Sequence, residues 1–215
     1  MKSNIVHIPV NGVSIEGALD LPDNAVGLVL FAHGSGSSRH SPRNNYVARV
    51  LREHGIGTLL MDLLTPQEDR DYTRRFDIDL LVERLLAVSK WVEVQPETAA
   101  LPLGYFGAST GAAAALRAAA VNSSIAAVVS RGGRPDLASP AELQQVKSPT
   151  LFLIGGEDHG VIELNESAFA NLHCEKRFVI IPGATHLFEE PGTLEQVAAL
   201  AADWFDQHFR QPALP

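Results

Sequence analysis

The chain has 215 residues, of which 46% are hydrophobic and 20% are charged, a composition typical of a globular protein with a substantial core. Its formal net charge of −8 argues against binding to nucleic acid or to an anionic membrane surface. One cysteine allows no disulfide within the chain. Neither a signal-peptide pattern nor a stretch long enough to span a bilayer occurs, so we expect a soluble, cytoplasmic protein.

The chain opens with a predicted antiparallel hairpin. Apolar residues alternate between 5 and 21 around Asn11-Gly12, a dipeptide that favours a tight hairpin turn. Short, continuous apolar runs follow, typical of strands buried on both faces of a parallel sheet, at 27–32, 57–63, 103–108, 125–130, 150–154 and 177–181. Segments with helical character separate them at 45–54, 78–94, 110–116, 140–146, 161–173 and 194–209, and 65–75 is expected to be a polar loop. This alternation predicts a single α/β domain over 1–215, with a mostly parallel sheet and an antiparallel edge.

The pentapeptide Gly107-Ala108-Ser109-Thr110-Gly111 lies between an apolar strand and an alanine-rich helix. Strand, sharp turn and helix form the context in which a Gly-x-Ser-x-Gly sequence presents a nucleophilic serine. We expect side chains at Gly107 and Gly111 to collide in so tight a turn, and the helix to aim its first N–H groups at the serine. By itself the pentapeptide carries little weight, since an idle serine at a glycine-lined crossing would give the same letters.

A nucleophilic serine needs a base, usually an imidazole that a buried carboxylate orients. Asp158 follows the strand predicted at 150–154, and His186 follows the last predicted strand. Because the carboxyl ends of parallel strands meet at one edge of a sheet, we expect Ser109, Asp158 and His186 to meet there. Glu157 and Asp136 are alternative carboxylates for this role.

These three residues occur in the order found in α/β-hydrolases. With Gly155-Gly156-Glu157-Asp158, Gly183-Ala184-Thr185-His186 and His33-Gly34, the chain resembles the α/β-hydrolase superfamily over nearly its whole length. Within it, the chain resembles the small, lid-less dienelactone hydrolase-like group. Dienelactone hydrolases proper carry a cysteine where this chain has Ser109, and an acid in the turn after the third strand that is absent here. The resemblance is therefore closer to the serine esterases of that group.

The tetrahedral intermediate of acyl transfer needs two N–H donors aimed at its oxygen. We predict the backbone N–H of Thr110 as one donor and that of Ser35 as the other. Alternatively, the glycines around Ser35 serve only to make a flexible turn. His33 is expected to brace this loop without acting as a catalyst.

Arginines in the predicted strand-end loops suggest an anionic substrate. Arg131, Arg134 and Arg39 could bind a carboxylate or phosphate through paired hydrogen bonds, with Arg131 or Arg134 as the main contact. The alternative is a set of solvated charges paired with Asp136 or Asp62.

The sequence thus predicts a serine hydrolase that cleaves small esters, lactones or thioesters through an acyl-enzyme on Ser109. No cofactor or metal is expected, because neither a phosphate-binding Gly-x-x-x-x-Gly-Lys loop nor a His-Glu-x-x-His pair occurs. The expected partner is a small-molecule substrate. A non-catalytic binding module of the same fold, or an acyltransferase or amidase with the same residues, remains an alternative, and the sequence does not give the oligomeric state.

Overall fold

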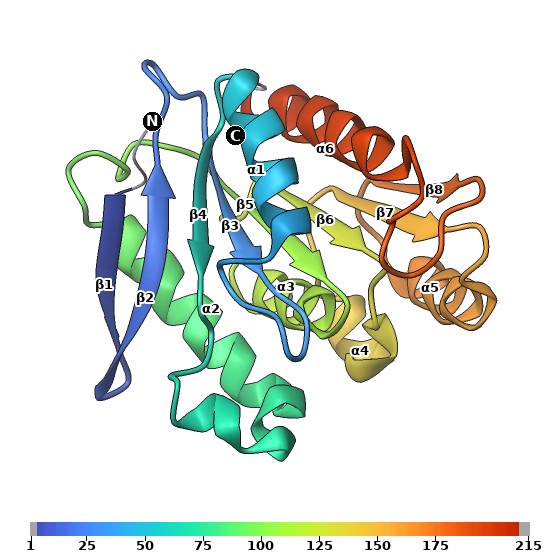
Figure 1. Ribbon diagram of the computed structural model, residues 1–215, viewed down its shortest axis with the longest axis horizontal. Coiled ribbons are helices and arrows are strands. Elements are labelled where there is room, and N and C mark those ends of the chain that lie inside the picture. Colours follow the sequence, from blue (N-terminus) through green and yellow to red (C-terminus); the bar gives the residue numbers. More distant parts are fainter. Residues whose placement is uncertain (1–3, 211–215) are drawn as a thin grey trace.

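The computed structural model describes residues 4–210, and within them eight strands form one sheet in the order β1-β2-β4-β3-β5-β6-β7-β8 (Figure 1). The strands are β1 (Asn4–Val10), β2 (Val13–Asp20), β3 (Leu28–Ala32), β4 (Gly57–Met61), β5 (Leu103–Ala108), β6 (Ala127–Arg131), β7 (Thr150–Gly155) and β8 (Lys176–Ile181). The pairs β1–β2 and β2–β4 are antiparallel, and all later pairs are parallel. The predicted parallel sheet with an N-terminal antiparallel hairpin is therefore confirmed.

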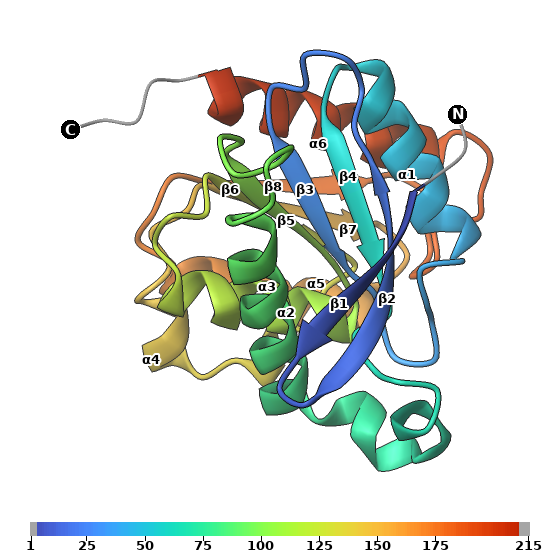
Figure 2. The same ribbon diagram turned by 90° about the vertical axis from the view of Figure 1, so that its left-hand side faces the viewer.

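Helices cover both faces of this sheet (Figures 1 and 2). One face carries α1 (Pro42–Glu53) and α6 (Thr193–Arg210), and the other carries α2 (Ile78–Val92), α3 (Thr110–Val121), α4 (Pro140–Leu143) and α5 (His159–Asn171). Alternate residues of the central strands fill the two apolar layers: Tyr105 belongs to the layer under α2 and α3, and Phe106 to the layer under α1 and α6. Both rings are fully buried, which explains why the central strands read as continuous apolar runs.

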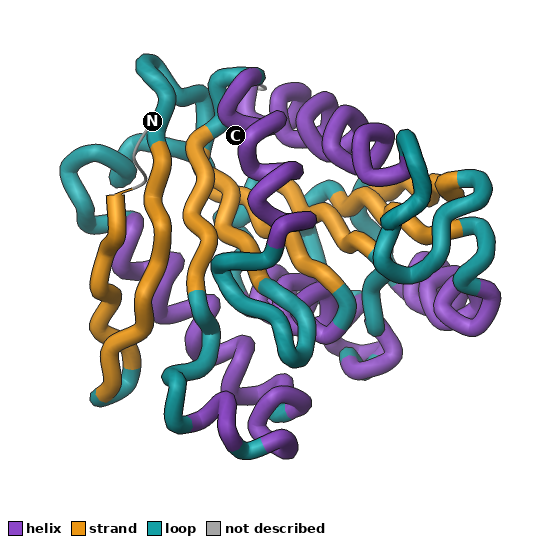
Figure 3. Tube along the Cα trace, in the orientation of Figure 1, coloured by secondary structure: helices purple, strands orange, loops and turns teal. Residues whose placement is uncertain are grey.

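The chain order of the strands reverses beside β3, because β4 pairs with one edge of β3 and β5 with the other. In open α/β sheets, ligands bind outside the carboxyl ends of the strands at such a reversal. The loops that leave the parallel strands here run along one edge of the sheet (Figure 3). The fold thus places the end of β5, and with it Ser109, in the middle of that edge.

Three predicted boundaries are wrong in informative ways. The segment predicted as a polar loop contains two short 3₁₀ helices, η1 (Glu68–Arg70) and η2 (Tyr72–Phe76), stabilised by local bonds such as that from Thr73 N–H to the Asp71 carboxylate (3.0 Å). Helix α1 begins at Pro42 because the Ser41 hydroxyl caps it by accepting the Asn44 N–H. Arg131, predicted to lie in a loop, is the last residue of β6.

Of the helices between residues 4 and 210, none is both long and apolar enough to cross a membrane.

Candidate active site

Ser109 links β5 to α3 in a strained backbone conformation, with φ 52° and ψ −120°. Around the serine, β5, α3 and the end of β3 approach one another so closely that side chains are excluded on both sides of it. A Cβ at Gly107 would lie 2.5 Å from Ala112 Cα, and one at Gly111 would lie 2.1 Å from the Ala32 carbonyl oxygen. The predicted collisions are confirmed, and both are with backbone atoms that cannot rotate away. The two glycines therefore allow the turn that presents Ser109 at the sheet edge.

The loop after β6 holds this turn from the other side. Ser109 N–H donates to the Arg131 carbonyl (3.2 Å), and Arg134 N–H donates to the Ser109 carbonyl (3.1 Å). Gly34 lies in the loop after β3, the strand on the other side of β5. It approaches Ser109 closely, since a Cβ on Gly34 would lie 3.1 Å from Ser109 Cβ. Ser109 is thus fixed between the ends of β3 and β6.

The loops after β7 and β8 bring Asp158 and His186 together. Gly156 N–H donates to the Ile181 carbonyl (2.9 Å) and Glu157 N–H to the Ala184 carbonyl (2.9 Å), so two hydrogen bonds hold the start of the loop after β7 against the end of β8 and the loop that follows it. The His186 Nδ1 and the Asp158 Oδ2 are 2.6 Å apart, and the Asp158 side chain is only 16% exposed. A carboxylate at this position fixes the ring orientation and leaves Nε2 free to face a substrate or a nucleophile.

The other carboxylates considered from the sequence have different partners. The Glu157 Oε2 lies 3.9 Å from the His159 Nε2, and the Asp136 carboxylate accepts two hydrogen bonds from the Arg134 guanidinium. The structure therefore assigns Asp158, and neither alternative, as the partner of His186.

His186 packs against the loop after β6. A Cβ placed on Gly132 would lie 3.5 Å from His186 Cε1, and Gly132 directly follows Arg131, whose carbonyl accepts the Ser109 N–H. All three predicted residues therefore gather at one edge of the sheet. Among the hydrogen bonds of residues 4–210, none joins the Ser109 hydroxyl to His186.

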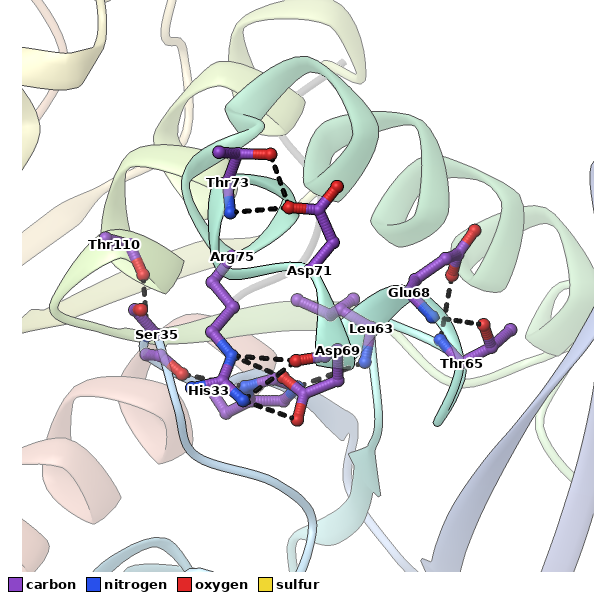
Figure 4. Close-up of polar contacts among 11 residues, drawn as sticks. His33, Ser35, Leu63, Thr65, Glu68, Asp69, Asp71, Thr73, Arg75 and Thr110 are labelled. Carbon is purple, nitrogen blue, oxygen red and sulfur yellow. Dashed lines mark hydrogen bonds and ion pairs between the residues drawn. The ribbon is translucent and has the colours of Figure 1, made fainter.

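The loop after β3 is braced by His33 (Figure 4). His33 Nε2 accepts from Leu63 N–H (3.1 Å), so Nδ1 carries the proton and donates to the Gly34 carbonyl (2.9 Å). Burial lowers the pKa of His33, which keeps the ring neutral as this pair of bonds requires. These contacts support the bracing role expected for His33.

Ser35 and Thr110, the two predicted oxyanion-hole donors, contact each other in the structure. Ser35 N–H donates to the Thr110 hydroxyl oxygen (2.9 Å), as Figure 4 shows. Thr110 is the first residue of α3, so its backbone N–H has no partner inside the helix. The Thr110 N–H is thus unpaired within its helix, whereas the Ser35 N–H already has an acceptor, and the role of both as oxyanion donors stays a prediction.

Arg75 was missed in the sequence because it lies in the polar segment after β4. Its guanidinium donates twice to the Asp69 carbonyl (3.0 and 2.8 Å) and pairs with the Asp69 carboxylate (Figure 4). A Cβ at Gly36 would lie 3.5 Å from Arg75 Nη1. Arg75 therefore ties η2 to Asp69 of η1 and lies against the loop after β3, a contact between distant segments that no local pattern signals.

The three arginines predicted to bind substrate differ in their partners. Arg39 forms ion pairs with Asp62 and Glu16, and Arg134 forms a two-point pair with Asp136. These are local pairs of the kind that the alternative interpretation expected. Arg131 differs, since it is buried and its Nε and Nη1 have no hydrogen-bond partner.

An eight-stranded sheet in this order, with a strained serine after β5 and an Asp–His pair after β7 and β8, defines the α/β-hydrolase class. A model of the dienelactone hydrolase family matches residues 40–210. A dienelactone hydrolase from Anabaena variabilis, known from a crystal structure, has 52% sequence identity to this chain. The two structures superpose with a TM-score of 0.93, over 98% of this chain and 100% of that one. The chain belongs to the dienelactone hydrolase family.

Two further proteins are similar to this chain, one in fold and one in sequence. Est1E from Butyrivibrio proteoclasticus shares the fold, with a TM-score of 0.82 at 17% identity, over 97% of this chain and 100% of that one. A Mycobacterium tuberculosis protein that carries the provisional name phosphoribosyl transferase is 55% identical over 99% of this chain, but over only 48% of its own length. The chain spans about half the length of the curated relatives it matches, so their name describes longer proteins.

Proposed function

We propose that this hydrolase is a carboxylic ester hydrolase that acts through an acyl-enzyme on Ser109. His186 takes the proton of the Ser109 hydroxyl as its oxygen attacks the carbonyl carbon, and Asp158 stabilises the resulting imidazolium. The tetrahedral intermediate collapses, and His186 returns the proton to the departing alcohol. Water, deprotonated by the same imidazole, then attacks the acyl carbon and releases the acid, restoring Ser109.

The observation that carries this proposal is the 2.6 Å contact between His186 Nδ1 and Asp158 Oδ2, at the sheet edge where Ser109 occupies a turn with positive φ. A buried carboxylate on Nδ1 is what a general-base histidine needs, because it fixes the tautomer that presents Nε2. The strained backbone of Ser109 is the second support, since strain of this kind persists where the surrounding structure enforces it, most often at functional sites.

We further propose that the developing negative charge is stabilised by the N–H groups of Thr110 and Ser35. The Thr110 N–H lies at the positive end of α3. The Ser35 N–H is held by the Thr110 hydroxyl at rest, and the proposal requires that hydroxyl to turn so that the Ser35 N–H reaches the substrate oxygen. Each donor of this type contributes about 3–4 kcal/mol to transition-state stabilisation.

We propose small esters, lactones or thioesters as substrates, with an acid group that Arg131 would bind. Arg131 is preferred over Arg39 and Arg134 because those two already have carboxylate partners. Acyl transfer and amide cleavage would use the same three residues. Acyl transfer would be seen as transfer of the acyl group to an added nucleophile, and amide cleavage as release of an amine. We assign no phosphoribosyl transfer to this chain.

A fluorophosphonate probe tests the mechanism. Wild-type protein should be labelled on Ser109, Ser109→Ala should not be labelled, and Asp158→Asn should be labelled far more slowly. A non-catalytic member of the fold would leave all three unlabelled and would refute the proposal. A panel of 4-nitrophenyl esters of varied length and charge, with the matching lactones and thioesters, would then define the substrate class.

A further inference from the structure

Asn165 is a buried amide on α5, the helix whose N-terminal cap is Asp158. Its side chain is 0% exposed and donates two hydrogen bonds. One goes to the Val161 carbonyl, a turn earlier in the same helix (2.7 Å), and the other to the Gly133 carbonyl in the loop after β6 (2.9 Å). Asn165 therefore joins the helix that begins at Asp158 to a loop 32 residues earlier in the chain.

The surroundings of Asn165 call for a hydrogen-bond donor. Both partners are backbone carbonyl oxygens, so only the NH₂ end of the amide can face them. The Oδ1 atom at the other end is buried without a hydrogen-bond partner. An apolar side chain of similar size would avoid the cost of that buried oxygen, and asparagine is a weak helix former. The two donors, and neither packing nor helix propensity, therefore explain an asparagine at this position.

The Gly133 carbonyl depends on Asn165 for its hydrogen bond. Gly133 is buried, and within residues 4–210 no backbone N–H donates to its carbonyl. A buried carbonyl without a donor is costly, so the side chain of Asn165 supplies what the backbone does not. A Cβ at Gly133 would lie 2.2 Å from the Ser130 hydroxyl oxygen and 2.8 Å from the Ala112 Cβ. The loop is thus pressed against β6 and α3 and is tied to α5 through Asn165.

The residues on either side of Gly133 contact the proposed nucleophile and base. Arg134 N–H donates to the Ser109 carbonyl (3.1 Å). Gly132 packs against His186, since a Cβ there would lie 3.5 Å from the His186 Cε1. A displacement of Gly133 would therefore disturb a hydrogen bond to the turn of Ser109 and the surface against which His186 packs.

From these contacts we propose that Asn165 is a positioning residue for the reaction, acting through the Gly133 carbonyl. It fixes the loop after β6 and thereby the geometry between Ser109 and His186. Because Asn165 is fully buried, it acts through these neighbours and does not touch substrate. The inference rests on the proposed hydrolytic function of Ser109. Small displacements matter for such a role, because an error of about 1 Å between reacting groups can lower a rate about 100-fold.

The first experiment uses steady-state kinetics on a 4-nitrophenyl ester. Asn165→Leu removes both donors at similar volume. We expect kcat to fall about 10–100-fold and KM to change less than about threefold, because the reacting groups are misplaced while the substrate-binding surface remains. Urea denaturation gives the folded fraction of each variant, and kcat is expressed per folded molecule.

Asn171→Leu is the matched control. Asn171 lies on the same helix, and its side chain donates only to the carbonyl one turn earlier, that of Ser167 (2.9 Å). It therefore has the bond within the helix but not the bond to the loop after β6. Asn171→Leu should keep kcat within about twofold of the parent.

Asn165→Asp tests the donor itself, because the introduced carboxyl group has the same shape as the amide. When ionised it donates nothing to the two carbonyl oxygens, and when protonated it regains one donor. Burial raises the pKa of a carboxyl group in such a position. The kcat of Asn165→Asp relative to the parent should therefore rise as the pH falls from about 8 to about 6, and at about pH 6 it should exceed that of Asn165→Leu. The relative kcat of Asn165→Leu should not depend on pH.

Hydrogen exchange gives a readout that does not depend on turnover. The Arg134 amide is bonded to the Ser109 carbonyl, and in Asn165→Leu it should exchange at least about tenfold faster than in the parent. In Asn171→Leu it should exchange at the parent rate. If Asn165→Leu does not fold, Asn165→Asp at about pH 8 takes its place in both measurements.

The proposal is overturned if Asn165→Leu keeps kcat within about twofold of the parent, or if its Arg134 amide exchanges at the parent rate. It is also overturned if Asn165→Asp is no more active than Asn165→Leu at about pH 6. If fluorophosphonate does not label the parent protein, the esterase proposal fails and with it the role in hydrolysis. Faster exchange in Asn165→Leu would then still show that Asn165 holds the loop, so the two failures are distinguishable.

Discussion

The strain at Ser109 gives a prediction that separates the fold from the chemistry. We compare Ser109→Ala with Ser109→Gly, two variants that both lack the proposed nucleophile. Alanine keeps the Cβ that makes φ 52°, ψ −120° unfavourable, whereas glycine adopts positive φ readily. The glycine variant should therefore be the more stable of the two, which is the reverse of the usual effect of glycine.

The size of the effect follows from three contributions. Holding a residue with a side chain in such a backbone region costs about 1–3 kcal/mol, which glycine recovers. Against this, glycine loses about 0.5–1 kcal/mol through the greater freedom of the unfolded chain, and the half-buried methyl group accounts for about 0.4 kcal/mol more. The expected net gain is about 1 kcal/mol, or about 2–4 °C in Tm for a chain of this size.

Urea denaturation and thermal scans of the two variants measure this difference. The matched control is Ser167, an exposed residue inside α5, where Ser167→Gly should be about 1 kcal/mol less stable than Ser167→Ala. Opposite signs at the two positions would support the strained turn. If Ser109→Gly is less stable than Ser109→Ala by as much as the control pair, the turn stores no strain and the reasoning fails.

Three further predictions follow from the site. Gly111→Ala places a Cβ 2.1 Å from the Ala32 carbonyl oxygen, so it should cost more than about 3 kcal/mol of unfolding free energy in urea, and a loss under 1 kcal/mol would contradict the geometry. Asp158→Asn should lower kcat on a 4-nitrophenyl ester by about 10³–10⁴-fold with little change in folding stability, whereas a loss under tenfold would remove Asp158 from catalysis. Burial lowers the pKa of His33, so the unfolded chain binds more protons and the unfolding free energy should fall as pH drops below about 6.5. His33→Gln should reduce that slope between pH 7.5 and 5, and an unchanged slope would show that His33 is charged in the fold.

Much of the fold and of the candidate site could be predicted because each depends on short-range physical rules. The sheet follows from continuous apolar runs, which mark strands buried on both faces, and the hairpin from Asn11-Gly12, both of which have positive φ. The turn at Ser109 follows from the steric demand for glycine at 107 and 111, which the Cβ distances bear out. The place of Asp158 and His186 follows from strand order, because parallel strands end at a shared edge.

The remaining features depend on long-range contacts that no local pattern encodes. Nothing in the sequence distinguishes Arg131 from Arg39 or Arg134, yet only Arg131 lacks a carboxylate partner. The difference arises because Arg39 lies near Asp62 and Glu16 from two other strands or their loops, a contact set by the antiparallel pairing of β2 with β4. Arg131 belongs to β6, one residue beyond the predicted end of that strand. Its side chain therefore packs against Phe188 in the loop that carries His186 and does not extend into solvent.

The same sheet register links Arg131 to the turn that carries Ser109. Arg131 pairs with Ala108 across β5 and β6, so its backbone carbonyl holds the Ser109 N–H while its side chain points to the α1 side. Phe188, which covers that side chain, follows His186 by two residues in one short loop. A substrate acid group bound at Arg131, as proposed above, would therefore lie close to the end of β6 that holds Ser109 and to the loop that carries His186. If this coupling holds, phosphate in place of that acid group should change the rate of fluorophosphonate labelling of Ser109 in the parent protein and leave it unchanged in Arg131→Met. Identical phosphate dependence in both proteins would show that Arg131 and Ser109 are independent.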